Sequence, residues 1–367
     1  MAGITALFYA LTGVHKPWVM LFYNALLHAF AFVVLIGLLT LLGFERRASL
    51  LASLPFLLFP SSLTWTAQIH RDGLYIAGFY LIFLSLLLLI KKNSLYSLAL
   101  LSIGVFMVYI SRPHMLIPLK YTIAILSLIF FILFVYNFIT RKEYNKAVLK
   151  LVLSILMVFI INPFLSKMQA QTAQTEMQVQ TAQTEIQAQT AQAQTIQPDW
   201  IKTPFLPEKL DNMFRVLAEI RKSFVEYYTN KPGNIDHDFV PCSLLDFIKY
   251  TPRAMQIGLF SPFPNIWFTK GGTASGTIAR YITPFEAVFV YLCLAISPWV
   301  IYRFRKDLAF WTLLFISLLF IWLHVLSEPN FGAIYRKRYA FIMFLTAMSV
   351  ATVLENKDRL RLKWLKR

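Results

Sequence analysis

The chain has 367 residues, of which 57% are hydrophobic and only 14% are charged, whereas about a quarter of a typical soluble domain is charged. Apolar runs of roughly twenty residues recur along most of its length, as in proteins whose helices cross a membrane. The formal net charge is +17, but lysine and arginine stand in short clusters between the apolar runs. We therefore exclude nucleic acid as the partner and interpret the charge as a membrane-topology signal.

The apolar windows predict an all-α integral membrane protein, a bundle of about nine transmembrane helices with one large extracytoplasmic loop between helices six and seven. Residues 1–166 hold the first six helices, and residues 281–367 hold the last three and a basic cytoplasmic tail. The expected spans are residues 17–43, 48–66, 73–90, 95–111, 116–139, 147–166, 281–302, 308–326 and 339–354.

Short basic clusters between the spans set the expected orientation. Counting the spans places five clusters on one side, which the positive-inside rule makes cytoplasmic. The C-terminus then lies inside and residues 167–280 lie outside. The N-terminus falls outside too, where residues 1–15 are apolar but too few to cross a bilayer. The sequence leaves open whether they form a half-helix or follow a longer start. The five clusters are Arg46 and Arg47, Lys91 and Lys92, and residues 141–146, 303–306 and 357–367.

The extracytoplasmic segment, residues 167–280, has three predicted parts. Residues 169–197 are mostly a tandem nonapeptide rich in glutamine and threonine, which we interpret as a variable spacer without chemistry. Residues 207–230 carry apolar side chains at helical spacing and predict an amphipathic helix. Residues 243–268 mix aromatic residues, prolines and Arg253, which favours an interfacial element over a span.

Several ionisable residues fall on the outer side, close to helix ends. Basic residues there oppose the positive-inside rule, so they need another purpose, and the planar fork of arginine suits phosphate. We expect the arginines to bind an anionic substrate, while a carboxylate and an imidazole beside them act in proton transfer. The predicted binding residues are Arg71, Arg112, Arg253, Arg336 and Arg338, and the predicted catalytic residues are Asp72, His70 and His114.

Each of these residues also has a structural interpretation. Asp72 and Arg71 can pair with each other, and Asp72 complements the dipole at the start of a helix. Arg112 and the proline after it can mark a helix stop with a snorkelling side chain. The basic residues at 336–338 can anchor the chain to lipid headgroups. What favours a site is that three separate loops place arginine on the side where topology disfavours it.

Four stretches resemble known families. Residues 22–74, which include "TWTAQIHRDGL", resemble the early spans of bacterial polytopic glycosyltransferases of the GT-C, protein-mannosyltransferase-like type. "YISRPHMLIP" (109–118), "TPRAMQIGLFSPFPNIW" (251–267) and "PNFGAIYRKRYAFIM" (329–343) resemble O-antigen-polymerase-like surface-polysaccharide proteins. GT-C enzymes place an essential acid in the first outer loop, whereas Asp72 lies one loop later. Polymerase-like proteins rely more on outer arginine and histidine, which suits "HRD" and "SRPH" better.

The resemblance implies an enzyme of the bacterial cytoplasmic (inner) membrane that transfers or polymerises polyprenyl-(di)phosphate-linked sugars at the extracytoplasmic face. The implied partners are that lipid-linked glycan, the bilayer and other polysaccharide-assembly membrane proteins. The sequence shows no metal-ligand spacing, and it leaves open whether Asp72 binds a divalent ion. The rival interpretations are a lipid-glycan flippase or other transporter, and a non-catalytic or truncated scaffold. The expected spans are nearly free of ionisable groups except near their ends, which favours the enzyme.

Overall fold

The structure is a computed structural model. It describes residues 2–68, 70–92, 94, 96–141, 200–227, 233–271 and 274–365, and the predicted repeat at 169–197 lies outside them. Throughout these ranges the regular elements are helices, and the extended contacts are two isolated bridges, Ile201 with Ser243 and Asn234 with Asn330. The all-α prediction is confirmed for the described residues.

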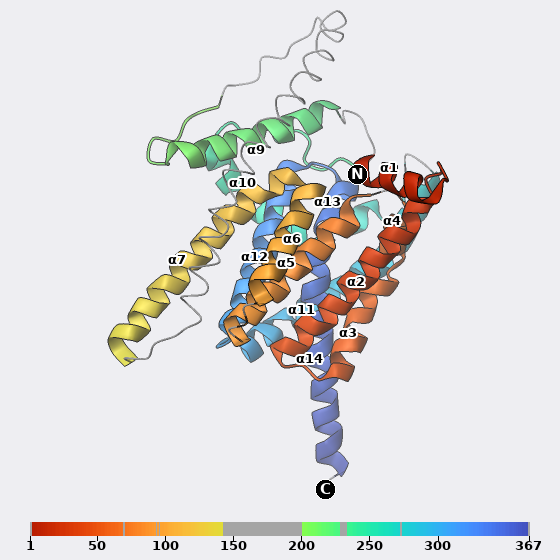
Figure 1. The fold of residues 1–367 in the computed structure, drawn as a ribbon. Helices are drawn as coiled ribbons and strands as arrows, with labels where there is room; N and C mark the ends of the chain where they lie inside the picture. Colours follow the sequence, from red (N-terminus) through yellow and green to blue (C-terminus); the bar gives the residue numbers. More distant parts are fainter. Residues whose placement is uncertain are drawn as a thin grey trace, which may run out of the picture. The chain divides into compact units, whose positions relative to one another are not determined.

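Figure 1 shows the helices of the described residues in chain order. They are α1 (Ala2–Thr12), α2 (Val19–Leu42), α3 (Arg46–Leu58), α4 (Pro60–Thr66), α5 (Asp72–Lys92), α6 (Tyr96–Ser111), α7 (Leu116–Arg141), α9 (Glu208–Tyr227), α10 (Leu244–Phe260), α11 (Ala274–Phe304), α12 (Leu308–Ser327), α13 (Phe331–Lys337) and α14 (Tyr339–Leu365), with 3-10 turns at Pro113–Met115 and Pro264–Ile266.

The chain divides into two compact units. The first consists of Met1–Arg112 and Ile201–Arg367, and the second consists of Pro113–Trp200 and contains α7. The first unit holds all the contacts discussed below.

Within the described residues, five helices are long and apolar enough to cross a membrane, namely α2, α5, α11, α12 and α14. α3 and α4 form a sixth span if this pair, bent by 61° at its break, counts as one. The multi-pass prediction is therefore confirmed in its coarse form, while the number nine is not. The expected span at 95–111 corresponds to α6, which has only 16 residues, the span at 116–139 corresponds to α7, and the span at 147–166 lies outside the described residues.

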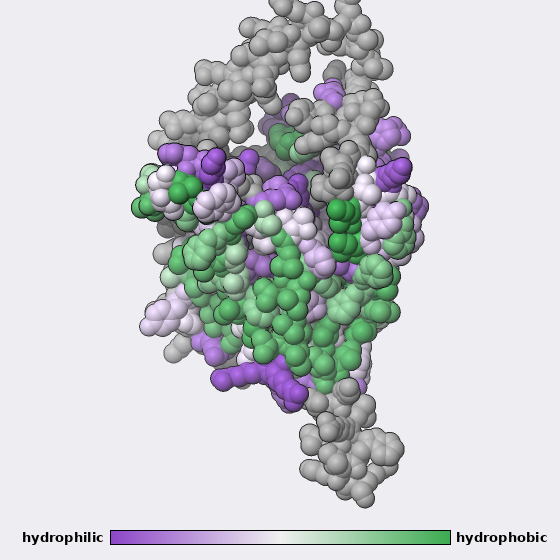
Figure 2. All heavy atoms as spheres, turned by 90° about the vertical axis from the view of Figure 1, so that its right-hand side faces the viewer, coloured by the Kyte–Doolittle hydropathy of each residue, from purple (hydrophilic) through white to green (hydrophobic). Residues whose placement is uncertain are grey.

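Apolar side chains cover the middle of one face of the bundle (Figure 2), and α5 and α14 lie in the interior of the first unit. In the most apolar window of each of these two helices, 78% of the residues are buried. On α11, by contrast, Phe285 and Leu292 are 73% and 61% exposed. Figure 2 shows hydrophobic side chains over the middle of one face and hydrophilic side chains towards both ends. Exposed apolar side chains of this kind suit a hydrocarbon environment, because lipid tails are as apolar as the side chains themselves.

Two glycines let α5 and α6 approach closely. A Cβ added at Gly104 would lie 2.8 Å from the carbonyl oxygen of Gly78 and 2.9 Å from the side chain of Ile82. Small residues at such a crossing allow backbone contact between membrane helices. The approach matters for the end of the bundle where the first residue of α5 and the residue after α6 meet.

We expect Gly104→Val to destabilise the protein by about 1–3 kcal/mol, because the added side chain would overpack the contact between α5 and α6. Thermal unfolding of the purified protein in nanodiscs measures the change. Gly37→Ala is the matched control, since Gly37 also lies within a helix but a Cβ there meets nothing within 4 Å. Equal unfolding temperatures for the two variants would contradict the close packing.

Charged contacts fix the end of the bundle that carries the predicted cytoplasmic clusters. Lys91 Nζ lies 2.7 Å from Asp307 Oδ2 and so joins the end of α5 to the start of α12. Glu355 of α14 accepts hydrogen bonds from the backbone N–H of Glu45 and from the guanidinium of Arg303. Three of the five basic clusters, near residues 46, 91 and 303, therefore share one end of the first unit.

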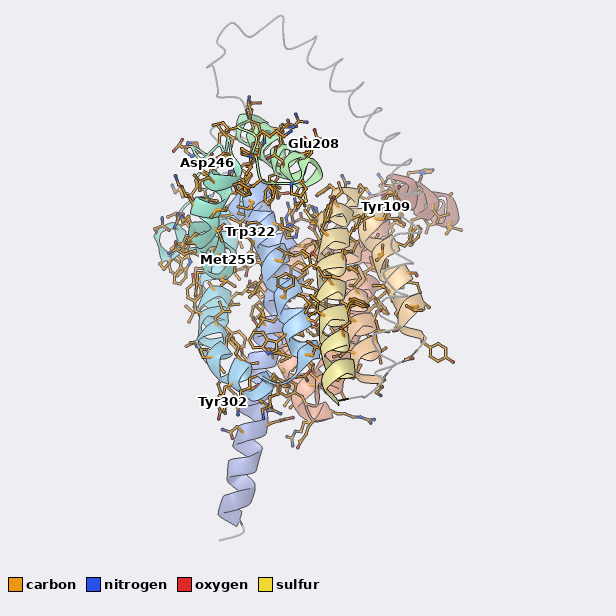
Figure 3. All side chains as sticks on the ribbon, turned by 90° about the vertical axis from the view of Figure 1, so that its left-hand side faces the viewer. Tyr109, Glu208, Asp246, Met255, Tyr302 and Trp322 are labelled. Carbon is orange, nitrogen blue, oxygen red and sulfur yellow. The ribbon has the colours of Figure 1, made fainter. Side chains whose placement is uncertain are left out.

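α9, α10 and α13 lie at the other end of the bundle, away from the C-terminus (Figure 1). Figure 3 places Glu208 of α9 and Asp246 of α10 at this end and Tyr302 of α11 at the opposite one. α9 and the first part of the expected 243–268 element are regular helices. Ser243 caps α10, because its hydroxyl oxygen accepts the N–H of Asp246. Pro252 lies within α10 without ending it.

Arg221 links α9 and the turn at residues 236–239 to the end of α12. Its side chain is fully buried. The guanidinium donates to the carbonyl oxygens of Asp236 (2.8 Å), Phe239 (2.8 Å) and Val325 (2.9 Å), and it also reaches Leu326. Since residues 325 and 326 belong to the last turn of α12, this one side chain satisfies carbonyls that the helix end leaves open. The amphipathic pattern of α9 does not reveal this role.

Candidate functional site

Asp72 is the centre of the candidate site. It opens α5, where a carboxylate is favoured by the helix dipole, and it is only 4% exposed. Arg112, the residue directly after α6, donates from Nη2 to Asp72 Oδ1. The close crossing of α5 and α6 brings these two residues together although 40 positions separate them. The pair lies at the end of the bundle opposite the Lys91–Asp307 contact.

Arg336 of α13 reaches the same carboxylate from a third part of the chain. Its Nη1 atom lies 3.9 Å from Asp72 Oδ2 and 3.2 Å from His70 Nε2. His70 also contacts the side-chain oxygen of Gln68 at 2.8 Å. The side chains of Arg112 and Arg336 are 15% and 30% exposed, and that of Asp72 is 6% exposed. Three of the predicted loops therefore converge on one half-buried cluster, which we call the Asp72 cluster (His70, Asp72, Arg112 and Arg336).

The Asp72 cluster carries more positive than negative charge. Two guanidinium groups face a single carboxylate, and Arg71 beside them is exposed. The Nε atom of Arg112 is buried and has no hydrogen-bond partner among the described residues. Such an excess of buried positive charge is unfavourable at the edge of an apolar bundle unless an anion balances it. The arrangement can therefore accept an anionic group such as a phosphate.

His70 is tuned towards its neutral form. Burial lowers the pKa of its imidazole below the ordinary 6.5, the guanidinium of Arg336 lowers it further, and Asp72 opposes them. A neutral imidazole at neutral pH can accept a proton or a hydrogen bond.

We expect Arg336→Gln to raise the pKa of His70, because the substitution removes a neighbouring positive charge. Titration of histidine-labelled protein by NMR measures the value, with His70→Gln to assign the signal. Arg280→Gln is the control, since Arg280 hydrogen-bonds Thr269 and the carbonyl of Lys270 instead. A His70 pKa that is the same with and without Arg336 would contradict this electrostatic account.

Two buried side-chain contacts, Tyr75 with His324 and Glu328 with Lys337, lie next to the Asp72 cluster. The hydroxyl of Tyr75, one turn into α5, lies 2.7 Å from His324 Nε2, and the guanidinium of Arg112 stands over the Tyr75 ring at 5.3 Å. Glu328, at the end of α12, forms a buried ion pair with Lys337 of α13. These contacts hold α6, α12 and α13 in place around the carboxylate.

The structure places the remaining predicted residues elsewhere. Arg253 forms a bidentate contact with Asp236, at 2.9 and 3.2 Å. Arg338 is 3% exposed and donates to the carbonyl oxygens of Ile257, Gly258 and Ser261 at the end of α10. His114 belongs to the second unit. Arg253 and Arg338 are therefore engaged in internal contacts, while Arg336, two residues away from Arg338, faces the Asp72 cluster.

Burial of Asp236 on its own raises the pKa of its carboxyl group, but hydrogen bonds from Arg253 and Tyr250 outweigh this and hold the pKa below its ordinary value. The carboxylate therefore stays charged at neutral pH. Asp236 adopts a φ of 46°, which is uncommon for a residue with a side chain. The contact between Arg253 and Asp236 thus stabilises the turn before α10 and leaves little donor capacity for a ligand.

Glu286 is a buried acid that was not among the predicted site residues. Glu286 is 4% exposed within α11 and accepts hydrogen bonds from the N–H of Ser61 (2.9 Å) and the hydroxyl of Tyr335 (2.8 Å). These hydrogen bonds link α11 to α4 and to Tyr335, the residue next to Arg336. A lone acid inside an expected span is itself a signal of a special role, and the sequence shows this one at position 286.

The cluster does not have the composition of a metal site. Across the described residues no group of three or more histidine, cysteine, aspartate or glutamate side chains converges to hold a metal ion. The neighbours of Asp72 are guanidinium groups, which repel a cation. The donor set therefore fits an anion.

Comparisons of the chain with protein-family models, with curated proteins and with solved structures give no match.

Proposed function

We propose that the protein is a membrane enzyme of cell-envelope polysaccharide assembly, which transfers or polymerises polyprenyl-(di)phosphate-linked sugars at the extracytoplasmic face of the bacterial inner membrane. The observation that carries this proposal is the Asp72 cluster, in which one buried carboxylate stands between two guanidinium groups at the polar edge of an apolar bundle. A lipid-linked donor has the matching shape, because its chain lies in the bilayer and its phosphates lie at the interface.

In this mechanism Arg112 and Arg336 hold the phosphate groups of the donor, and Arg71 adds charge at the exposed side. Without a bound donor, the carboxylate of Asp72 is the ion-pair partner of these guanidinium groups. When the phosphates replace it as their partner, the carboxylate is released to accept the proton of an acceptor hydroxyl. His70, held neutral beside Arg336, assists that proton transfer. The guanidinium groups also stabilise the negative charge that develops on the departing phosphate.

A deletion of the gene in its host tests the proposal. We expect loss of the surface glycan and accumulation of short lipid-linked glycan on the outer side. Restoration should succeed with the intact gene and fail with Arg112→Ala or Arg336→Ala at matched protein amounts. Accumulation on the cytoplasmic side instead would point to a flippase. Full restoration by both variants would reject the catalytic role of the cluster.

The proposed orientation, with the C-terminus in the cytoplasm, has its own expected result. In a variant without Cys242 and Cys293, Arg71→Cys should react with a membrane-impermeant maleimide in intact cells. Tyr302→Cys should react only after permeabilisation, because residue 302 lies at the opposite end and is 64% exposed. The reverse pattern would invert the orientation and place the Asp72 cluster on the cytoplasmic side.

A further inference from the structure

A small cavity with several polar residues in its lining adjoins the Asp72 cluster on the side of α2. It has a volume of about 20 Å³ and is lined by residues of α2, α4, α5 and α14. A volume of this size holds about one water-sized group, provided that polar partners surround it. Gly73 brings α5 into contact with α2 here, since a Cβ on it would meet the side chain of Leu27 at the ordinary contact distance of 3.5 Å. The cavity lining includes Asn24, His28, His70 and Asp72.

Two polar side chains that line this cavity have unused hydrogen-bonding atoms. Asn24 is 2% exposed and His28 is 5% exposed. Asn24 donates from Nδ2 to the carbonyl oxygen of Gln68, which leaves its Oδ1 atom as an acceptor. Asn24 Oδ1 and His28 Nε2 are both buried without a hydrogen-bond partner among the described residues. Leaving such atoms unpaired costs about 1–3 kcal/mol each, so a missing partner is expected.

Asp72 is a third polar residue in the lining of the same cavity. Its Oδ1 atom accepts from Arg112, whereas its Oδ2 atom lies 3.9 Å from the nearest guanidinium nitrogen of Arg336, beyond hydrogen-bond distance. A carboxylate, an amide and an imidazole side chain therefore all belong to the lining of one cavity. A hydroxyl group suits this set, because it donates its proton to an acceptor and accepts a hydrogen bond from a donor.

We infer that this cavity is the binding site for the nucleophilic hydroxyl group, and that Asn24 and His28 are positioning residues that orient it towards Asp72. The inference rests on the proposed function and assigns the acceptor side of the same reaction. The hydroxyl proton passes to Asp72 Oδ2 as the hydroxyl oxygen forms a bond with the anomeric carbon of the donor sugar. The bond between that carbon and the phosphate oxygen breaks, and its electron pair leaves with the phosphate held by Arg112 and Arg336. The hydroxyl group comes from a glycan alcohol or from water, and the products tell these two sources apart.

The shape of His28 offers a matched pair of variants. Its ring stacks on Phe56 with the centroids 4.5 Å apart. His28→Phe keeps an aromatic ring for this stacking but removes the polar nitrogen, while His28→Gln keeps a hydrogen-bonding end. Asn24→Leu removes the amide oxygen at similar volume, together with the amide donor to the carbonyl oxygen of Gln68. Phe30→Leu, at a lipid-facing position on the same helix that is 41% exposed, serves as the control.

The experiment restores the deletion strain with each full-length variant and measures two quantities. One is the amount of extended lipid-linked glycan and of free glycan released, and the other is the unfolding temperature of the purified protein in nanodiscs. We expect His28→Phe and Asn24→Leu to reduce glycan transfer by roughly a hundredfold at an unchanged or higher unfolding temperature. His28→Gln should retain more transfer than His28→Phe, and Phe30→Leu should behave like the wild type. Loss of extended glycan identifies an alcohol as the nucleophile, and loss of released free glycan identifies water.

Three results would overturn the inference, and they separate it from the proposed function. If His28→Phe and Asn24→Leu restore full transfer while Arg112→Ala fails, the site is real but the cavity has no role in it. If both cavity variants lose transfer together with thermal stability, and His28→Gln does not rescue, the two side chains only stabilise the fold. If the deletion itself leaves the glycan and the lipid-linked intermediates unchanged, the proposed function fails and the inference falls with it.

Discussion

Asp72→Asn is expected to lower glycan transfer by about 10²–10⁴-fold, because it removes the proton acceptor of the Asp72 cluster while keeping the shape of the side chain. The amide oxygen can still accept from Arg112, so the fold should persist. Asp72→Ala is expected to have a further effect. It leaves the guanidinium groups of Arg112 and Arg336 without a carboxylate in a largely buried position, which costs about 3–5 kcal/mol of stability.

The two variants are compared in the restored deletion strain, with transfer measured from the lipid-linked glycan and stability from thermal unfolding in nanodiscs. Asp238→Asn is the control, since its carboxylate is 88% exposed and contacts only His237 among the described ion pairs. Wild-type transfer by Asp72→Asn would show that the carboxylate is a structural counter-ion and not a base.

Arg221→Met is expected to lower the free energy of unfolding by about 3 kcal/mol or more, since several buried carbonyl oxygens lose their donor at once. The effect should be concentrated where α9 and the turn at 236–239 meet the end of α12. Limited proteolysis should therefore cleave near α9 at lower temperatures than in the wild type. Glycan transfer should decline only as far as the folded protein is lost.

The same helix provides the control for Arg221. Arg215 is half exposed and pairs with Glu219 one turn later, and such surface pairs contribute about 0.2–1 kcal/mol. Arg215→Met should therefore leave the unfolding temperature nearly unchanged. If both arginines gave the same small effect, the buried contacts of Arg221 would not hold α9 in place.

Hydropathy was enough to predict most of the apolar helices, because a hydrocarbon environment demands long apolar runs. It could not tell whether the short runs cross the membrane, as α6 and the bent pair of α3 and α4 illustrate. The site was predictable in part. Topology counting placed Asp72, Arg112 and Arg336 on one side, and the structure brings these three together.

The contacts of the individual arginines could not be predicted from the sequence. Positions 336 and 338 lie on nearly opposite sides of a helical turn, so only one of them can face Asp72. Which one does so depends on how the chain just after α13 meets the end of α10, where Arg338 is bound, and a local pattern does not contain this. The role of Arg221 could not be predicted either, since nothing in the sequence of its amphipathic helix distinguishes it from Arg215. Asn24 and His28 each have a buried atom without a hydrogen-bond partner among the described residues, and the sequence alone does not reveal this.

The buried pair of Glu328 and Lys337 has a consequence for how related sequences can differ. Each side chain is largely buried, at 3% and 8% exposure, so losing either one leaves an uncompensated charge, whereas replacing both with apolar residues is often tolerated. Evolution therefore has no easy single step between the charged and the apolar pair. We expect positions 328 and 337 to covary among homologues, so that lineages carry both charges or neither. A sequence that has lost only one of the two charges should belong to a gene that no longer encodes a stable protein.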